Sequence, residues 1–304
     1  MKKIDVHVHL IGAICGFGAE GELRALGDGM VEYASGKQFR LIPKGYGDKE
    51  VTAETLLSVM DEHEVAYAVC LQGNYVGFQN LYTYEAARKY PHRLIAAGTF
   101  DPFCRGKEKI IHHLFEELKI PVLKMELSNT SGLMANHPTV FLNQAEMDAV
   151  YQLADSKNLI VFIDIGRPRN DCYQIAELKE SILKYPNVIF ILCHLTAPQQ
   201  DDQVLLEENM RQLALPNVYF DLAALPNNTK EAYPFVKAQQ YIRTAMDLVS
   251  SDRILWGSDF PSAMNYCSYR ESYQYILDSD LFTLEEKEKL FFKNAERLFG
   301  RFIQ

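Results

Sequence analysis

The segment Lys3-Ile4-Asp5-Val6-His7-Val8-His9-Leu10 is an apolar strand that carries two histidines, and the rest of the chain is best interpreted from it. Successive side chains of a strand point to opposite faces, so we expect Asp5, His7 and His9 to share one face. A buried strand with such a face must satisfy these groups with a metal ion or a hydrogen-bond network. Two imidazoles separated by one residue can chelate one cation; the alternative is a pair of hydrogen-bonded histidines near the surface. The opposite face, which we expect in apolar packing, holds Ile4, Val6, Val8 and Leu10.

Short apolar runs with the character of buried strands recur along the whole chain. Each is rich in β-branched or aromatic residues and is nearly continuous in its hydrophobicity, which is typical of a parallel sheet buried on both faces. Together with the opening segment they number eight, at residues 3–9, 66–71, 94–100, 121–126, 159–164, 188–193, 218–222 and 253–257.

Amphipathic stretches of helical length lie between these runs. A final helix begins at Thr283, where Thr283 and Glu286 have the spacing of a capping box. Eight strands that alternate with helices favour a (β/α)8 TIM barrel, an α/β fold, over a doubly wound sheet. The other predicted helices cover residues 52–63, 79–90, 106–118, 144–157, 172–184, 203–214, 231–250 and 268–278.

Residues 11–50 break this rhythm, since they separate the first strand from its helix and are rich in glycine. A loop of this length without an element of its own is uncommon in a compact domain. Residues 38–42 have strand character, so we expect a small β-ribbon over the barrel mouth. It would serve as a lid or an oligomer contact; the alternative is a surface insertion without a role. We expect one domain over residues 1–304.

Composition restricts the kinds of partner and the cellular compartment that we expect for this protein. The net charge of −9 argues against a nucleic-acid partner, which requires a basic surface. The six cysteines have no C-x-x-C spacing, so we expect reduced thiols and a cytoplasmic protein. No secretory signal is apparent at the start, and no apolar run approaches the roughly 18 residues of a membrane span, so no membrane partner is expected.

Ionisable residues follow the apolar runs where each strand ends. The carboxyl ends of barrel strands build the active site, so we expect these residues to meet there. Histidines and carboxylates together suit zinc, and manganese, iron or cobalt also fit. A bound cation lowers the pKa of water to about 7, which supplies a nucleophile at neutral pH. The residues concerned are His7, His9, Lys124, Glu126, Asp164, Arg167, His194, Asp221 and Asp259.

Three motifs carry a resemblance to a known family. Ile4-Asp-Val-His-Val-His9, Cys193-His-Leu195 and Trp256-Gly-Ser-Asp-Phe-Pro261 resemble the metal-site signatures of the amidohydrolase superfamily. More narrowly, the chain resembles the amidohydrolase-related branch that includes aminocarboxymuconate semialdehyde decarboxylase, γ-resorcylate decarboxylase and pyrone-dicarboxylate lactonase. The ending Lys293-Asn-Ala-Glu-Arg-Leu-Phe299 is similar to the last helix of that branch.

The resemblance implies a role for each matching residue. His7 and His9 match the metal ligands of the first strand, and Asp259 matches an aspartate that ligates the metal or accepts the proton of the attacking water. His194 matches a histidine that orients or activates this water. Lys124 falls on a lysine of the branch, which in two-metal relatives is carboxylated and bridges the ions.

The fifth strand departs from the pattern of the branch. Phe162-Ile-Asp-Ile-Gly166 has Asp164 where the branch usually has a histidine ligand. A carboxylate can fill the same coordination position and shifts the preference toward harder ions such as manganese. The alternatives are that Asp164 is a hydrogen-bonding or substrate-binding group, and that the site holds no metal.

The leading hypothesis is an enzyme that hydrolyses a small amide, ester or lactone with metal-activated water. His194 and Asp259 would be catalytic, and His7, His9, Asp164 and Asp259 would hold the metal, most simply zinc. Arg167 and Lys124 would bind the substrate, since a guanidinium can clamp a carboxylate. The rivals are non-oxidative decarboxylation of an aromatic or unsaturated acid, and a barrel that only binds a ligand. Barrels of this branch are often homodimers.

Softer expectations concern the pocket wall and the remaining histidines. Tyr75, Phe260 and Tyr266 are candidate apolar walls, and Glu126 is a candidate partner for Lys124. Asp221 is expected to pack and form hydrogen bonds. The other histidines, expected to be structural or solvated, are His63, His92, His112, His113 and His137.

Overall fold

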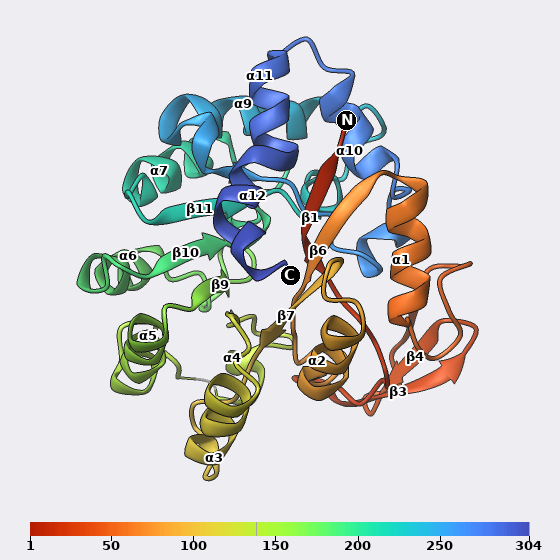
Figure 1. The fold of residues 1–304 in the computed structure, drawn as a ribbon, viewed down its shortest axis with the longest axis vertical. Helices are drawn as coiled ribbons and strands as arrows, with labels where there is room; N and C mark the ends of the chain where they lie inside the picture. Colours follow the sequence, from red (N-terminus) through yellow and green to blue (C-terminus); the bar gives the residue numbers. More distant parts are fainter. Residues whose placement is uncertain (138, 304) are drawn as a thin grey trace.

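A computed structural model of the chain describes residues 1–137 and 139–303, and over these residues eight parallel strands form one sheet in chain order. The prediction of a (β/α)8 barrel is confirmed, and Figure 1 shows the helices arranged around the strands. The strands are β1 Lys3–Val8, β6 Val65–Cys70, β7 Leu94–Gly98, β8 Val122–Glu126, β9 Ile160–Asp164, β10 Ile189–Leu192, β11 Val218–Asp221 and β12 Ile254–Leu255.

The barrel closes where its first and last strands meet. The backbone N–H of Val6 donates to the carbonyl of Trp256 at 3.2 Å, and the N–H of His9 donates to the carbonyl of Phe260 at 2.7 Å. Between them, the N–H of Asp259 donates to the carbonyl of His7 at 2.9 Å. We call this contact the seam of the barrel, and it brings the two ends of the sequence together.

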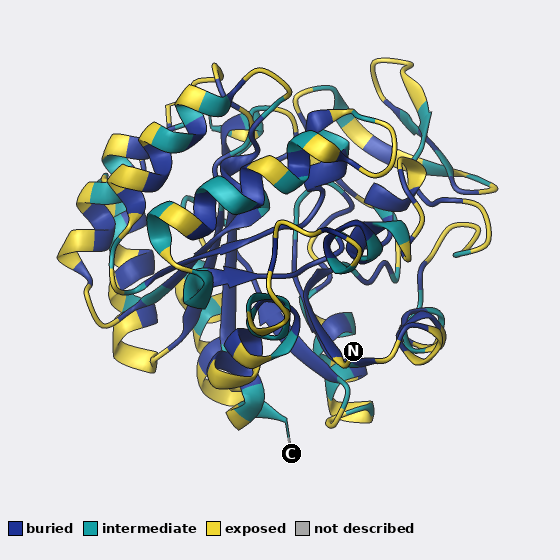
Figure 2. Cartoon of the chain, turned by 90° about the horizontal axis from the view of Figure 1, so that it is seen from above, coloured by how far each residue is buried: buried dark blue, intermediate teal, exposed yellow. Residues whose placement is uncertain are grey.

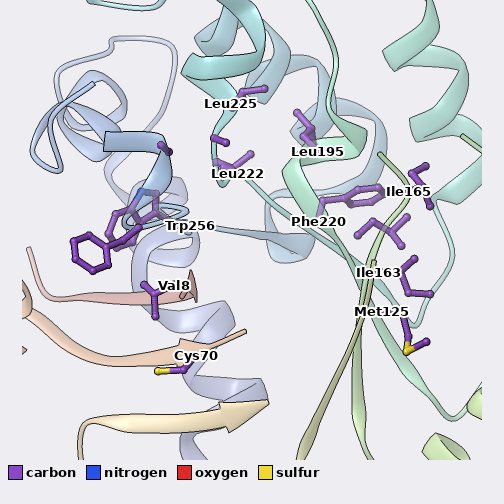
Figure 3. Close-up of a cluster of buried hydrophobic side chains, with 14 of the residues drawn as sticks. Val8, Cys70, Met125, Ile163, Ile165, Leu195, Phe220, Leu222, Leu225 and Trp256 are labelled. Carbon is purple, nitrogen blue, oxygen red and sulfur yellow. The ribbon is translucent and has the colours of Figure 1, made fainter. Parts of the chain in front are cut away.

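The helices pack their apolar faces on the outer faces of the strands, as Figure 2 shows by the buried inner and exposed outer sides. The side chains buried between the strands and the helices form one apolar cluster. Figure 3 shows part of this cluster, in which strand residues such as Val8, Cys70 and Phe220 lie with Trp256. The helices are α1 Ala53–Glu62, α2 Asn80–Lys89, α3 Lys107–Ile111, α4 Leu133–Asn136, α5 Ala145–Lys157, α6 Ile175–Lys184, α7 Gln203–Leu213, α8 Leu225–Thr229, α9 Val236–Val249, α10 Glu271–Leu277, α11 Leu284–Glu288 and α12 Asn294–Phe299.

A second apolar cluster fills the inside of the barrel. It draws on every one of the eight strands, with Val6 and Phe162 among its fully buried members. Leu298 and Phe299 of α12 belong to the same cluster, so the last helix covers one end of the barrel (Figure 1). The opposite end, where the strands finish, is left for polar groups.

Some helix limits differ from those predicted. Thr283 caps α11 with the expected capping box, but the helix predicted over residues 231–250 begins only at Val236. Phe235, just before it, has a left-handed backbone, and proline at 234 disfavours helical geometry for the residue that precedes it. The helix predicted over residues 106–118 consists of α3 followed by a π-helical segment, His112–Glu117.

Residues 11–50 contain a small antiparallel sheet. Its strands, in order, are β2 Phe17–Gly18, β3 Gly21–Gly27, β4 Met30–Tyr33 and β5 Gln38–Arg40. Phe39 of β5 stacks on Tyr75 of the loop after β6, with ring centroids 6.0 Å apart. The sheet is therefore packed against a loop at the carboxyl end of a barrel strand.

None of the helices in the described part of the chain has the length and apolar character needed to cross a bilayer.

Candidate metal centre and active-site cavity

A bulge in β1 decides where its polar side chains point. Asp5 pairs with Ala68 and Val8 with Cys70, so three steps on β1 face two on β6. Such an extra residue reverses the alternation of side chains beyond it. Val6 therefore lies in the barrel interior, and His7 lies on the same side, 6.5 Å from the ring of Phe162.

The prediction that Asp5 shares a face with His7 and His9 is therefore wrong. Asp5 is fully buried, and its carboxylate accepts hydrogen bonds from the N–H groups of His7 and Ser258 and from the hydroxyl of Tyr269. These hydrogen bonds connect β1 to the segment after β12 at the seam. Asp5 is not in the group that faces the barrel mouth.

His7, His9 and Asp259 converge at the seam. The Nε2 atoms of His7 and His9 lie 3.6 Å and 3.2 Å from the same oxygen, Oδ1 of Asp259. Asp259 has a left-handed backbone, with φ of +59°, which aspartate tolerates better than most residues. The potential ligand atoms of these three residues all lie within 4.8 Å of one another.

Both imidazoles are held from the Nδ1 side. Nδ1 of His7 lies 3.0 Å from Oδ2 of Asp221, and Nδ1 of His9 lies 3.2 Å from the carbonyl oxygen of Leu71. Both partners are acceptors, so Nδ1 carries the proton in each ring and Nε2 presents a lone pair. Burial lowers the pKa of His7 to about 4, against the opposing effect of Asp221, so this ring is neutral at pH 7.

The donor set fits a divalent cation. Two Nε2 lone pairs that face one carboxylate oxygen repel one another unless a proton or a cation lies between them. Two imidazoles and a carboxylate are ligands that zinc accepts, and anchoring of the second ring nitrogen is typical of histidines that bind metals. His7, His9 and Asp259 therefore form a candidate metal centre.

Asp221 holds two parts of the site at once. Besides His7, it accepts hydrogen bonds from the backbone N–H groups of His194 and Ala223, at 2.9 Å and 3.0 Å. Burial would raise its pKa, but the adjacent imidazole of His7 and the charge and backbone N–H of His194 offset this and leave the pKa of Asp221 below its ordinary value. The expected packing and hydrogen-bonding role of Asp221 matches these contacts.

Lys124, Asp164 and His194 form a second cluster. Oδ2 of Asp164 lies 3.4 Å from Nε2 of His194 and 3.9 Å from Nζ of Lys124. Lys124 also donates to the sulfur of Cys193 at 3.2 Å. In the described chain two groups have ligand atoms within 4.8 Å of one another, namely His7, His9 and Asp259, and His7, His194 and Asp221; Asp164 belongs to neither. Its predicted role as a ligand stays a prediction.

The charges of this second cluster depend on one another. Burial would lower the pKa of His194, but the hydrogen bond and charge of Asp164, with the charges of Asp259 and Asp221, raise it to about 10. Burial would raise the pKa of Asp164, but Lys124 and His194 hold it well below its usual range. The cluster is therefore an ammonium, a carboxylate and a protonated imidazole.

All seven predicted site residues line one cavity of about 590 Å³. Glu126 and Tyr75 also line it, and Glu126 accepts hydrogen bonds from the hydroxyls of Ser128 and Ser131 instead of pairing with Lys124. The predicted residues that the cavity brings together are His7, His9, Lys124, Asp164, Arg167, His194 and Asp259.

Two of the predicted wall residues lie elsewhere. Phe260 is fully buried against Tyr46 and Tyr269, because the residue after Asp259 points back into the core. The hydroxyl of Tyr266 donates to the carbonyl of Glu231 at the surface. Neither residue is part of the cavity wall, so these two expectations are wrong.

The cavity wall also contains residues that carried no signal in the sequence. The inserted sheet contributes Tyr33, Lys37 and Phe39, and loops and α8 contribute four asparagines. Such residues are common on any surface, and nothing in their spacing distinguishes them. The asparagines are Asn129, Asn170, Asn227 and Asn228.

The comparison with protein families identifies the class of this enzyme, since the amidohydrolase sequence model matches residues 4–301. The chain therefore belongs to the amidohydrolase family and is an enzyme of the metal-dependent hydrolase type.

Solved structures of the same fold include enzymes of two kinds. A probable 2-pyrone-4,6-dicarboxylic acid hydrolase from Acinetobacter baumannii, with citric acid bound, is 18% identical, with a TM-score of 0.71 over 99% of this chain and 100% of that one. An amidohydrolase from Burkholderia multivorans with bound zinc is 16% identical, with a TM-score of 0.73 over 99% of each chain.

The second kind is a lyase. The 2,6-dihydroxybenzoate decarboxylase from Rhizobium is 14% identical, with a TM-score of 0.57 over 82% of this chain and 88% of that one. At these identities the likeness establishes the fold. A comparison with curated proteins finds no match.

Proposed function

We propose that this protein hydrolyses a small ester, lactone or amide with the help of one divalent ion held by His7, His9 and Asp259. The observation that carries the proposal is the anchoring of both Nδ1 atoms, which leaves two Nε2 lone pairs facing one carboxylate oxygen. Zinc suits two imidazoles and one carboxylate, and manganese is the second choice.

An ion at this centre supplies a Lewis acid that makes water nucleophilic at neutral pH. The residues of the chain provide the proton transfers. Burial would raise the pKa of Asp259, but the three imidazoles around it, His7, His9 and His194, lower it to about 2, so Asp259 is an anion that can accept a proton. His194 is fixed by its Nδ1 atom, 2.8 Å from the carbonyl of Ala223, and lines the cavity with a proton to donate.

Arg167 and Lys124 are the proposed substrate-binding cations. Arg167 is exposed and lines the cavity, and it has no ion pair with the residues that the structure describes. Its guanidinium is free to bind a substrate carboxylate through two hydrogen bonds. Lys124 is 2% exposed and paired with Asp164, so it contributes positive charge at the cavity floor.

Non-oxidative decarboxylation remains the second candidate, and one observation favours it. A protonated His194, in a cavity that Lys124 and Arg167 also line, is placed to deliver a proton to carbon after a carboxylate has been lost. Hydrolysis consumes water and decarboxylation does not, so an experiment with labelled water distinguishes the two reactions.

The test combines metal analysis with isotopic labelling. The purified protein would be assayed for zinc and manganese by mass spectrometry, then supplied with panels of lactones, esters, amides and unsaturated acids in ¹⁸O-water. Hydrolysis predicts one ¹⁸O atom in the product carboxylate. Release of carbon dioxide without ¹⁸O incorporation supports the lyase, and absence of both metal and turnover after metal addition contradicts both.

A pair of histidine variants provides the matched control. His9→Asn removes a proposed ligand, whereas His92→Asn changes an exposed histidine outside the cavity. We expect the first variant to lose metal and turnover together, and the second to keep both.

We also propose a cytoplasmic location, since all six cysteines are free thiols. Whether the chain forms a homodimer, as barrels of this branch often do, can be tested by light scattering.

A further inference from the structure

Both oxygens of the Asp164 carboxylate are already used by the protein. Oδ1 accepts a hydrogen bond from the backbone N–H of Gly166 at 2.8 Å. Oδ2 faces Nε2 of His194 and Nζ of Lys124, at 3.4 Å and 3.9 Å. The carboxylate lies between two cationic side chains of neighbouring strand ends, and it does not join the ligand atoms of His7, His9 and Asp259.

His194 needs such support because its backbone is unusual. Four consecutive residues, His194 to Ala197, have left-handed φ values of 60°, 53°, 62° and 53°. A run of this kind is costly for residues with side chains and persists only where the surroundings impose it. The structure holds His194 at three points: its N–H by Asp221, its Nδ1 by the carbonyl of Ala223, and its Nε2 by Asp164.

Lys124 also depends on Asp164. Its ammonium group is almost fully buried, and its other close partner is the neutral thiol of Cys193, a weak acceptor. A buried charge without a counter-charge is strongly unfavourable. A histidine at position 164 would leave this ammonium without a carboxylate, so Lys124 and Asp164 belong together as a pair.

We propose that Asp164 is a positioning residue, which fixes the Nε2 side of His194 and neutralises Lys124, and that the metal ion is held by His7, His9 and Asp259 without it. The inference rests on the proposed function for the metal centre. It assigns the residue at the end of β9 to the proton-transfer group and not to the ligand set.

The test uses Asp164→Asn, which keeps the shape of the side chain. If its oxygen still accepts from Gly166, its amide group faces His194 and Lys124 with donors where the carboxylate had acceptors. We expect metal content and metal affinity to stay within about threefold of the wild type, kcat to fall about 10- to 100-fold and KM to change little. Asp148→Asn is the control, because Asp148 also pairs with a lysine, Lys184 at 2.6 Å, but lies outside the cavity.

A double variant tests whether Asp164 acts through His194. Asp164→Asn should lower kcat much less in a His194→Asn background than in the wild type, since residues that act as a unit are not additive. Loss of metal from Asp164→Asn as complete as from His9→Asn would overturn the inference and make Asp164 a ligand. Additive effects of Asp164→Asn and His194→Asn would overturn it as well.

A stability cycle separates this inference from the proposed function. The contact between Asp164 and His194 exists without metal or substrate, so the single and double variants can be compared by urea unfolding of metal-free protein. We expect the loss of stability caused by Asp164→Asn to be less than half as large in the His194→Asn background. If the wild type binds no metal but this coupling is present, the proposed function fails and the positioning role stands.

Discussion

The imidazole of His7 is bound to Asp221 by a hydrogen bond of 3.0 Å between Nδ1 and Oδ2, and both side chains are almost completely buried. The two residues lie at the ends of β1 and β11, which are not neighbours in the sheet. Asp221 therefore reaches past β12 to set the proton of the ring, and the tautomer of His7 depends on a residue 214 positions away.

Asp221→Asn should weaken metal binding. An amide group that faces Nδ1 of His7 is a donor, which favours the tautomer with the proton on Nε2 and removes the lone pair needed for coordination. Loss of such a partner lowers metal affinity by about 10- to 100-fold. Titration against a competing chelator measures this change, and Asp148→Asn is the control. Unchanged affinity would mean that Asp221 does not set the tautomer.

Gly257→Ala should displace His7. A Cβ atom at this position would lie 2.7 Å from Cβ of His7 and 3.2 Å from its backbone nitrogen, because β1 and the last strand come close at the seam. Overpacking of this kind costs about 1–3 kcal/mol of stability. We expect a lower midpoint in urea and reduced metal content. Gly106→Ala, where a Cβ meets nothing within 4 Å, should be silent in both measurements.

Metal addition should stabilise the folded protein. A ligand that binds only the native state, at one hundred times its dissociation constant, adds about 2.7 kcal/mol. For a chain of this size that corresponds to a rise in Tm of about 5 °C. Differential scanning calorimetry of chelator-treated protein, with and without zinc, provides the measurement. A similar rise in His9→Asn would place the ion somewhere else.

Phe39→Ala should weaken substrate binding and leave the metal centre intact. Phe39 stacks between Tyr33 and Tyr75, with ring centroids 5.6 Å and 6.0 Å away, and all three line the cavity. Loss of the ring opens the wall on the side of the inserted sheet, so we expect KM to rise about 10-fold while kcat changes little. Phe17→Ala, an exposed position on the same sheet, is the control; equal effects would argue against a wall function.

Acid should destabilise the protein partly through His63. This ring stacks on Tyr269 and contacts the hydroxyl of Tyr273, and burial lowers its pKa below the ordinary value despite the charge of Glu62. The unfolded chain therefore binds a proton more readily, so stability is complete above about pH 6.5 and falls as the pH drops toward the folded-state pKa. His63→Gln should flatten this part of the stability profile in urea, whereas His92→Gln should follow the wild type.

The barrel could be predicted because its strands are buried on both faces and read as continuous apolar runs. The runs at 159–164 and 188–193 show this, since each appears as a strand within one or two residues of the expected limits. Residues that directly follow such runs, such as Asp259, could be assigned to the cavity for the same reason, because the carboxyl ends of the strands meet there.

What could not be predicted depends on contacts between distant segments. The bulge that separates Asp5 from His7 arises from pairing with β6, which no local pattern records. The burial of the Phe260 side chain in the core follows from the backbone pairing at the seam. The position of Asp164 beside His194 follows from the left-handed backbone of residues 194–197, after β10. In each case the residue type indicated a functional or core position, but the direction in which the side chain points could not be predicted.

The seam has a consequence for how the protein is made. His7 and His9 are synthesised well before Asp259, yet the potential ligand atoms of the three come together across the seam. A nascent or truncated chain that lacks the final strand would present only two imidazoles, a much weaker chelate. Tight metal uptake would thus report that the ring of strands has closed, and could be used as a signal for the completion of folding.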